Sequence, residues 1–240
     1  RAILFGETND PLRDGRGRPV AVIPCCVDGT RFTVPSESER NEIRDRIGAH
    51  GRTVIAYIGS GGWYLTKETE DFYRIAKSEM DKSFALVLTQ GPKEKIVEML
   101  ARAGFSEKDR FVSSVTPTEL PSYLWAADFA VSFIKPCYSR QASSPTKNAE
   151  YLASGLPVVV NDGIGDTSHH LTVDRVGVVL SGFSNEEIRH GLAELKSLLK
   201  EGELLTARCR DTSENRFSLT NIGGVKYRDL YRRLSGSVDG

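Results

Sequence analysis

The start of one predicted helix carries side chains that suit an anionic ligand. Ser144 suits the N-cap of that helix and Pro145 its first position. The unpaired amides near Thr146 and Lys147, together with the helix dipole and the lysine charge, favour a group such as a diphosphate. Glu150 follows one turn later on the same face, where a carboxylate can accept hydrogen bonds from two vicinal ribose hydroxyls. A structural interpretation stays open, because capped helix starts are common and Glu150 can simply pair with Lys147 along the helix.

A glycine-rich loop, Gly59-Ser60-Gly61-Gly62-Trp63, is a second candidate for ligand contact. Glycines let the backbone approach a phosphate or a sugar that a Cβ atom would hold away. The loop lacks the last glycine of the dinucleotide fingerprint, and the next strand ends in Thr89-Gln90 rather than in an acid. A nicotinamide or flavin site is therefore disfavoured, while a tight turn with Trp63 over the edge of the core stays open.

Short apolar runs alternate with amphipathic stretches from about residue 53 onward. Such runs are typical of parallel strands that are buried on both faces and joined by helices. We expect strands at Val54–Gly59, Phe84–Thr89, Phe111–Val115, Phe129–Ile134, Pro157–Asn161 and Gly177–Leu180, and helices near 67–80, 92–104, 118–127, 145–154, 165–172, 184–200 and 202–213. The predicted fold class is α/β, with a doubly wound parallel sheet that binds ligands at the carboxyl ends of its strands.

The segments before and after this pattern do not show the regular alternation of strands and helices. Before residue 53 we expect a polar loop at 6–19, a short strand at Val20–Pro24 and a helix at Ser36–Ile47. A C-terminal helix over about 219–235 carries an apolar stripe, which must pack against something. The stripe consists of Tyr227, Leu230, Tyr231 and Leu234.

The composition disfavours several classes of partner. The chain has 32 basic and 32 acidic side chains, so no global charge favours nucleic acid. No apolar run is long enough to span a bilayer, and the N-terminus lacks the apolar core of a signal peptide. The four cysteines and four histidines lack the spacing of a metal site, and we expect reduced thiols in a cytoplasm.

Residues 144–159, which read S-P-T-K-x-x-E-Y-L-A-x-G-x-P-V-V, resemble the donor-binding motif of the family-4 retaining glycosyltransferases. The two Rossmann-like domains of these enzymes form the GT-B fold. Residues 22–32 resemble the family's V-I-P-N-G-V-D linker, with Cys25-Cys26 in place of Asn-Gly, and residues 119–128 resemble its E-L-P-x-L-x-x-A-D motif. Residues 216–231 resemble the helix that crosses back to the first domain.

The resemblance implies a role for each matching position. Glu150 would bind the ribose of the donor, and Thr146 and Lys147 would meet its diphosphate. The loop of Gly59, Ser60 and Gly61 would lie beside the phosphates or the transferred sugar. The backbone around Val112–Val115, with side chains of the loop that follows, would contact the base. No metal and no cofactor is expected, because helix amides and cationic side chains stabilise the leaving diphosphate.

Two departures from the family pattern concern the sugar and the phosphates. The position eight residues before Glu150, where the family usually has a glutamate that touches the transferred sugar, is Ala142. The family also usually places cations soon after the first strand, where this chain has none before Lys67. Lys67, Lys135 and Arg140 are the candidate replacements.

These observations predict the C-terminal half of a glycosyltransferase. Residues 1–50 would be a linker and a remnant of the preceding domain, 51–218 the donor-binding domain, and 219–240 the crossing helix and tail. The complete enzyme would transfer a hexosyl unit with retention to a glycan or lipid-linked acceptor in polysaccharide biosynthesis. It would need an N-terminal acceptor domain and would work in the cytoplasm, with peripheral association at the membrane. A sugar-nucleotide epimerase and a non-catalytic nucleotide-sugar-binding module remain the alternatives.

Overall fold

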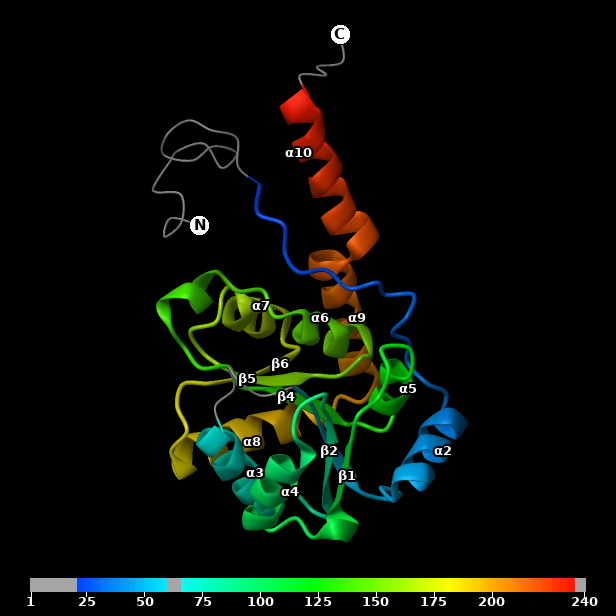
Figure 1. The fold of residues 1–240 in the computed structure, drawn as a ribbon, viewed down its shortest axis with the longest axis vertical. Helices are drawn as coiled ribbons and strands as arrows, with labels where there is room; N and C mark the ends of the chain where they lie inside the picture. Colours follow the sequence, from blue (N-terminus) through cyan, green and yellow to red (C-terminus); the bar gives the residue numbers. More distant parts are fainter. Residues whose placement is uncertain (1–20, 60–65, 236–240) are drawn as a thin grey trace.

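The computed structural model describes residues 21–59 and 66–235, which form a parallel sheet between two layers of helices (Figure 1). The strands are β1 Thr53–Ile58, β2 Ser83–Leu88, β3 Arg110–Ser113, β4 Phe129–Ser132, β5 Val158–Asn161 and β6 Gly177–Leu180. Their spatial order is β3-β2-β1-β4-β5-β6, and every neighbouring pair is parallel. The predicted doubly wound α/β fold is therefore confirmed.

The helices follow the strands in the expected alternation. They are α2 Glu37–Ile47, α3 Thr66–Glu79, α4 Lys93–Arg102, α5 Leu120–Leu124, α6 Thr146–Ala153, α7 Thr167–Asp174, α8 Asn185–Leu199, α9 Glu203–Phe217 and α10 Val225–Ser235. Helix α3 packs against α4 and α8, while α6 packs against α9. Figure 1 shows α6, α7 and α9 on one side of the sheet and α3, α4 and α8 on the other.

Burial of the strands accounts for their uninterrupted apolar sequences. All six residues of β2 and all four of β4 and β5 are buried, as a sheet covered on both faces requires. Aromatic rings fill the space beneath α3, where Phe72 contacts Phe133 edge to face at a ring distance of 5.1 Å and Tyr73 contacts Phe105 at 5.5 Å. This packed interior holds the carboxyl ends of the strands in place.

Helix α2 is joined to the sheet by a shared carboxylate. Asp128 accepts hydrogen bonds from Arg40 at 2.6 Å, from Arg44 at 2.8 Å and from the amide of Val54 at 2.7 Å. Ser36 caps α2, in a capping box with Glu39. The start of β1, the end of α5 and helix α2 therefore meet at one ion-pair network.

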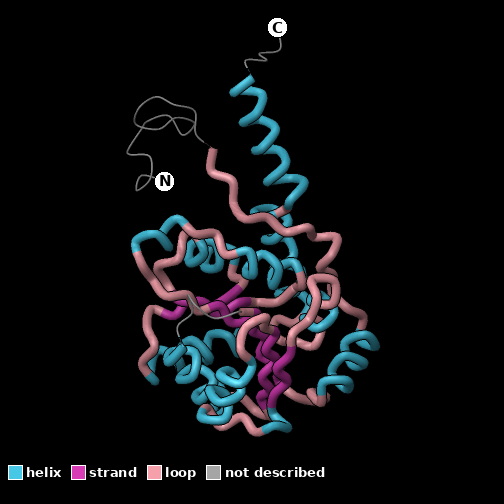
Figure 2. The backbone as a smooth tube through the Cα atoms, in the orientation of Figure 1, coloured by secondary structure: helices cyan, strands magenta, loops and turns pink. Residues whose placement is uncertain are grey.

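The predicted strand at Val20–Pro24 is wrong for the four residues of it that the structure describes. Residues 21–24 form no regular structure, and Figure 2 shows them as part of a long loop. The backbone pairing occurs further along, where the amide of Val27 donates to Phe217 and its carbonyl accepts from Leu219. Val27 forms an isolated parallel bridge with Ser218, directly after α9, and its apolar side chain is buried at this place.

Of the two C-terminal helices, α9 packs against the body of the molecule and α10 extends away from it. Helix α9 continues four residues beyond the expected end, to Phe217, and a π-helical turn at Leu219–Gly224 leads into α10. No residue of α10 is buried, and Tyr227, Tyr231 and Leu234 are exposed. Figure 1 shows α10 projecting from the body of the molecule. Within the described residues, no helix has the length and apolar character needed to cross a membrane.

Candidate functional site

A cavity of about 300 Å³ opens at the carboxyl ends of the first three strands. This is the edge of an open parallel sheet at which ligands bind, beside the point where the strand order reverses between β1 and β4. Its lining comprises Ile58, Gly59, Leu88, Thr89, Gln90, Val115, Thr116, Pro117, Leu120, Lys147 and Glu150. The predicted base, phosphate and ribose positions therefore meet here, since Val115, Gly59, Lys147 and Glu150 line one space.

Gly59 forms the floor of this cavity at the end of β1. Its amide donates to the carbonyl of Leu88 at 3.1 Å, which continues the sheet by one residue. A Cβ atom at this position would lie 2.4 Å from the phenol oxygen of Tyr57, so a side chain would force the ring to move. A glycine at this position therefore leaves room for the ring of Tyr57 behind the cavity wall. Ser60 and Gly61, the other predicted phosphate contacts of this loop, lie outside the described residues.

Helix α6 begins one residue later than expected. Pro145 occupies the N-cap, and no side chain caps the helix. Ser144, predicted as the cap, instead accepts a hydrogen bond from the amide of Cys25 at 3.1 Å. The cap prediction is wrong because a distant backbone donor takes the hydroxyl oxygen. The first turn, with Thr146 and Lys147, still starts at the cavity wall, where helix amides lack preceding carbonyl partners.

Glu150 lies half-buried on the cavity wall, one turn along α6 from Lys147. Burial raises the pKa of its carboxyl group, and the charges of Lys147 and Arg31 act in the opposite direction. Arg31 reaches this place because its guanidinium donates to the carbonyl of Pro117 at 2.8 Å. A carboxylate that is short of water and flanked by cations is well suited to accept hydrogen bonds from ligand hydroxyls.

A second cavity, of about 500 Å³, adjoins the first across Lys147, which lines both. Its other lining residues are Cys25, Ser132, Ile134, Arg140, Ala142, Ser143, Ser144, Pro145 and Thr146. The predicted diphosphate residues Ser144 and Thr146 therefore lie together with Lys147 and with one of the three candidate cations, Arg140. Ala142 lies on the same wall and offers no polar group to a ligand.

The other two candidate cations lie away from both cavities. Lys67, on α3, pairs with Asp71 at 2.6 Å and keeps 82% of its side chain exposed, while Lys135 is exposed after β4. Neither belongs to the lining of the cavities. Val112, whose backbone was predicted with that of Val115 to contact the base, lies within β3 and is not part of the cavity lining, whereas Val115 is.

Sequence reasoning did not name several residues that line the first cavity, which are Thr89, Gln90, Thr116, Pro117 and Leu120. Thr89 and Gln90 directly follow β2, and Thr116 and Pro117 belong to the loop after β3, so their position after predicted strands was the available signal. Leu120 is the first residue of α5. The side-chain amide of Gln90 donates to the carbonyl of Val115 at 2.8 Å and joins the two loops. Arg31 carried no such signal, because its place depends on a contact across 86 residues.

No protein-family model and no curated protein sequence matches this chain. Solved structures do match it. A glycosyltransferase from Rickettsia africae is similar over 94% of this chain and 59% of its own, with a TM-score of 0.71 at 13% identity. HepE from Anabaena, in complex with UDP-glucose, is similar over 90% of this chain and 58% of its own, with a TM-score of 0.70 at 16% identity.

A third match concerns a single domain. The C-terminal domain of the group 1 glycosyltransferase LpcC from Francisella tularensis is covered over 99% of its length by 80% of this chain, with a TM-score of 0.59 at 17% identity. The fold is that of a GT-B glycosyltransferase C-terminal domain. The predicted resemblance is confirmed at the level of the fold, and the chain spans 54% to 60% of the larger structures it matches.

Proposed function

We propose that this GT-B domain binds the nucleotide-diphosphate sugar of a glycosyltransferase. The observation that carries the proposal is the placement of Lys147 and Glu150 on one face of α6, at the join of two cavities. The base, the ribose and the diphosphate of a nucleotide sugar follow one another along the molecule. Along the two cavities, apolar loops, a carboxylate and cations follow one another in the same order.

The base and the ribose would occupy the first cavity. The base lies between the loops that follow β2 and β3, near Val115 and Leu120, and Glu150 accepts hydrogen bonds from the ribose hydroxyls. Such bonds to a desolvated carboxylate are worth about 1.5–3 kcal/mol each. The raised pKa of Glu150 supports this role, because a carboxylate that has lost water gains most from new hydrogen-bond donors.

The diphosphate would lie at the start of α6. The first-turn amides, the Thr146 hydroxyl and the charges of Lys147 and Arg140 face its oxygens, and their field favours the negative charge that develops as the sugar leaves. In this proposal the cations and the helix start do this work without a metal ion, and addition of a chelator leaves nucleotide binding unchanged.

The transfer itself would need more than this domain. We propose that a hexosyl unit passes with retention to a glycan or lipid-linked acceptor, and that a separate N-terminal domain binds that acceptor. Such an enzyme would act in polysaccharide biosynthesis in the cytoplasm, with peripheral association at the membrane. The single glycosyltransferase domain is then expected to bind its donor weakly and to transfer nothing.

A non-catalytic nucleotide-sugar-binding module is the second candidate, and Ala142 favours it. The residue lies on the wall of the second cavity, where a carboxylate would be placed to hold sugar hydroxyls. The methyl group leaves the sugar with fewer polar contacts. A chain that binds nucleotide diphosphates equally well with and without a sugar would support this candidate.

Calorimetry with UDP, GDP and ADP and with their glucose conjugates tests the proposal. We expect one nucleotide to bind, and Glu150→Ala to weaken it by about tenfold or more. Glu194→Ala is the matched control, since this exposed glutamate lies on α8 and lines neither cavity. The proposal fails if no nucleotide binds or if both variants bind alike.

A further inference from the structure

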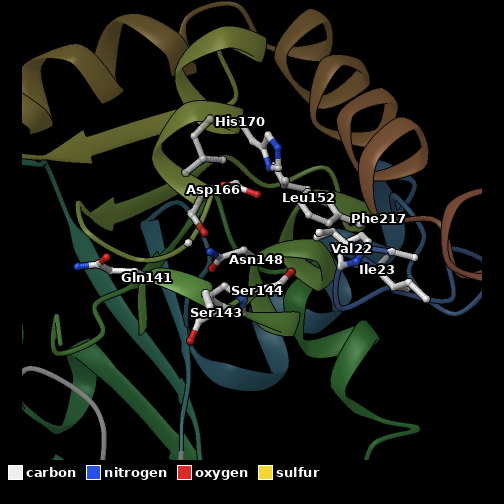
Figure 3. A pocket seen from close by; sticks show the side chains of 17 residues that line it. Val22, Ile23, Gln141, Ser143, Ser144, Asn148, Leu152, Asp166, His170 and Phe217 are labelled. Carbon is white, nitrogen blue, oxygen red and sulfur yellow. The ribbon is translucent and has the colours of Figure 1, made fainter. Parts of the chain in front are cut away.

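A third cavity, of about 270 Å³, lies beyond residues 142–145 from the proposed nucleotide site (Figure 3). Its walls come from residues 21–24, from α6 and α7, and from Phe217 at the end of α9. Asn148 and Leu152 of α6 line it, whereas Lys147 and Glu150 of the same helix line the nucleotide cavity. One face of α6 therefore lines the third cavity, and another face lines the first cavity.

Asn148 is the first sign of a ligand in this third cavity. Its side chain is only 5% exposed, and its Oδ1 atom has no hydrogen-bond partner among the described residues. A buried acceptor without a donor costs about 1–3 kcal/mol, so a fold rarely keeps one unless another group supplies the donor. Figure 3 shows Asn148 in the wall between Ser144 and Asp166.

A second acceptor lies close by at the start of α7. Asp166 occupies the N-cap of this helix, yet its carboxylate makes no capping hydrogen bond to the helix amides. The carboxylate lines the cavity together with the hydroxyl-bearing residues Ser143, Ser144 and Thr167. The polar part of the lining thus offers an amide oxygen, a carboxylate and several hydroxyls that both donate and accept, which suits a ligand with several hydroxyl groups.

The remaining wall is apolar and aromatic. Leu152, Leu171 and Phe217 line it, and the ring of His170 meets that of Phe217 edge to face at 5.7 Å. Burial, with the nearby Arg216 guanidinium, lowers the pKa of His170, which favours the uncharged imidazole. A neutral aromatic surface opposite a row of acceptors matches a sugar ring, which has an apolar face of C–H groups and a rim of hydroxyls.

The walls are held in place by contacts between distant segments. The amide of Gly165 donates to the carbonyl of Arg140 at 3.0 Å, and the amide of Cys25 donates to Ser144 at 3.1 Å. The first bond ties the segment after β4 to the start of α7, and the second ties the same segment to the residue that follows Pro24. The volume is at the small end of ligand sites, which suits one ring rather than a nucleotide.

We propose that this third cavity binds one neutral carbohydrate ring, whose hydroxyls donate to Asn148 and Asp166 and whose apolar face packs on His170 and Phe217. The ring is either a free hexose or one unit of a longer glycan, since both present the same chemistry. The ring would lie outside the nucleotide site, because none of the four residues lines the first or the second cavity, although residues 142–145 form a wall shared by the second and third cavities.

Ligand-observed and amide-detected NMR on the 240-residue chain tests the proposal. The probes are glucose, galactose, mannose, the methyl glucosides and maltose, each measured with and without saturating nucleotide. We expect saturable binding of at least one of them, with shifts at the Asn148 side-chain amide and at His170, that persists when nucleotide is present. Tighter binding of maltose than of methyl glucoside would indicate a glycan unit, and the reverse a single sugar.

Two variants locate the binding. Asn148→Leu and Asp166→Asn should each weaken the sugar by about tenfold while leaving nucleotide affinity unchanged, and Glu150→Ala should leave the sugar unaffected. The proposal is overturned if no sugar binds, if ethylammonium binds in place of every sugar, or if nucleotide sugar competes the probe away. A melting temperature for each variant shows whether it is folded. If Asn148→Leu does not fold, the milder Asp166→Asn still tests the proposal.

Discussion

The backbone amide of Ile58 donates a hydrogen bond to the phenol oxygen of Tyr151 across 2.7 Å. Ile58 ends β1 and Tyr151 follows Glu150 in α6, so this bond joins the floor of the first cavity to the helix that carries its carboxylate. The phenol of a fully buried tyrosine thereby sets the distance between two walls of the proposed nucleotide site.

Tyr151→Phe should lower the free energy of unfolding by about 1–3 kcal/mol, because the amide of Ile58 loses its acceptor inside the protein. Chemical denaturation measures this change, and nucleotide titration should show a weaker affinity as well. Tyr73→Phe is the matched control. Tyr73 is equally buried, but its hydroxyl has no hydrogen-bond partner within residues 21–59 and 66–235, so its removal should leave stability unchanged or higher.

Glu150→Gln should raise the melting temperature at pH 7 while weakening the nucleotide. Burial raises the pKa of Glu150 in the folded chain, so the fold loses stability as pH rises from the ordinary value through the raised one. Glutamine removes that loss, and the two proteins should become equally stable at pH values below the ordinary pKa. An unchanged melting temperature at pH 7 would contradict the claim that burial penalises this carboxylate.

The affinity of the wild-type chain for nucleotide should fall on acidification. In the proposed site the ionised carboxylate would accept ribose hydroxyls, so binding should weaken as pH drops through the pKa of Glu150, which burial raises from the ordinary glutamate value. Calorimetry between pH 7 and about pH 4 measures this decline in affinity. That pH interval includes the ordinary pKa range of glutamate. Glu150→Gln should show a flatter profile, and equal slopes for both proteins would count against this role.

Lys147→Ala should weaken a nucleoside diphosphate by about tenfold and leave the nucleoside alone nearly unaffected, because the lysine would face the phosphates in the proposed site. The salt dependence of binding should also decrease. Lys67→Ala serves as control, since Lys67 is exposed, paired with Asp71 and outside both cavities. If Lys67→Ala weakens the diphosphate as much, the placement of the phosphates at α6 is wrong.

Gly165→Ala should destabilise the fold strongly and loosen the start of α7. The new Cβ atom would lie 1.8 Å from the backbone carbonyl oxygen of Ser143, and the residue has a φ of +50°. Overpacking against backbone typically costs about 1–3 kcal/mol beyond the strain of the left-handed conformation. Gly48→Ala isolates that strain, because Gly48 has a φ of +76° and a Cβ atom there would have no neighbour within 4 Å. Equal losses in both variants would show that the contact with Ser143 does not matter.

The alternation of strands and helices, and therefore the sheet, follows from local sequence alone. The apolar run predicted at Phe84–Thr89 forms β2, one residue earlier than expected, and Gly177–Leu180 forms β6 at the expected residues, because burial on both faces leaves a continuous apolar pattern along the chain. The face of α6 shared by Lys147 and Glu150 followed in the same way from helical spacing.

The distant groups that complete the sites are visible only in the folded chain. The Ser144 hydroxyl does not cap α6 but accepts a hydrogen bond from the amide of Cys25, 119 residues away. A hydrogen bond from Arg31 to the carbonyl of Pro117 holds the guanidinium near Glu150. The orphaned Oδ1 of Asn148 likewise became visible only once α7 and Phe217 enclosed it. Periodicity along a chain reports which face of an element is buried, whereas the partner of a polar side chain depends on packing between elements that are far apart in sequence.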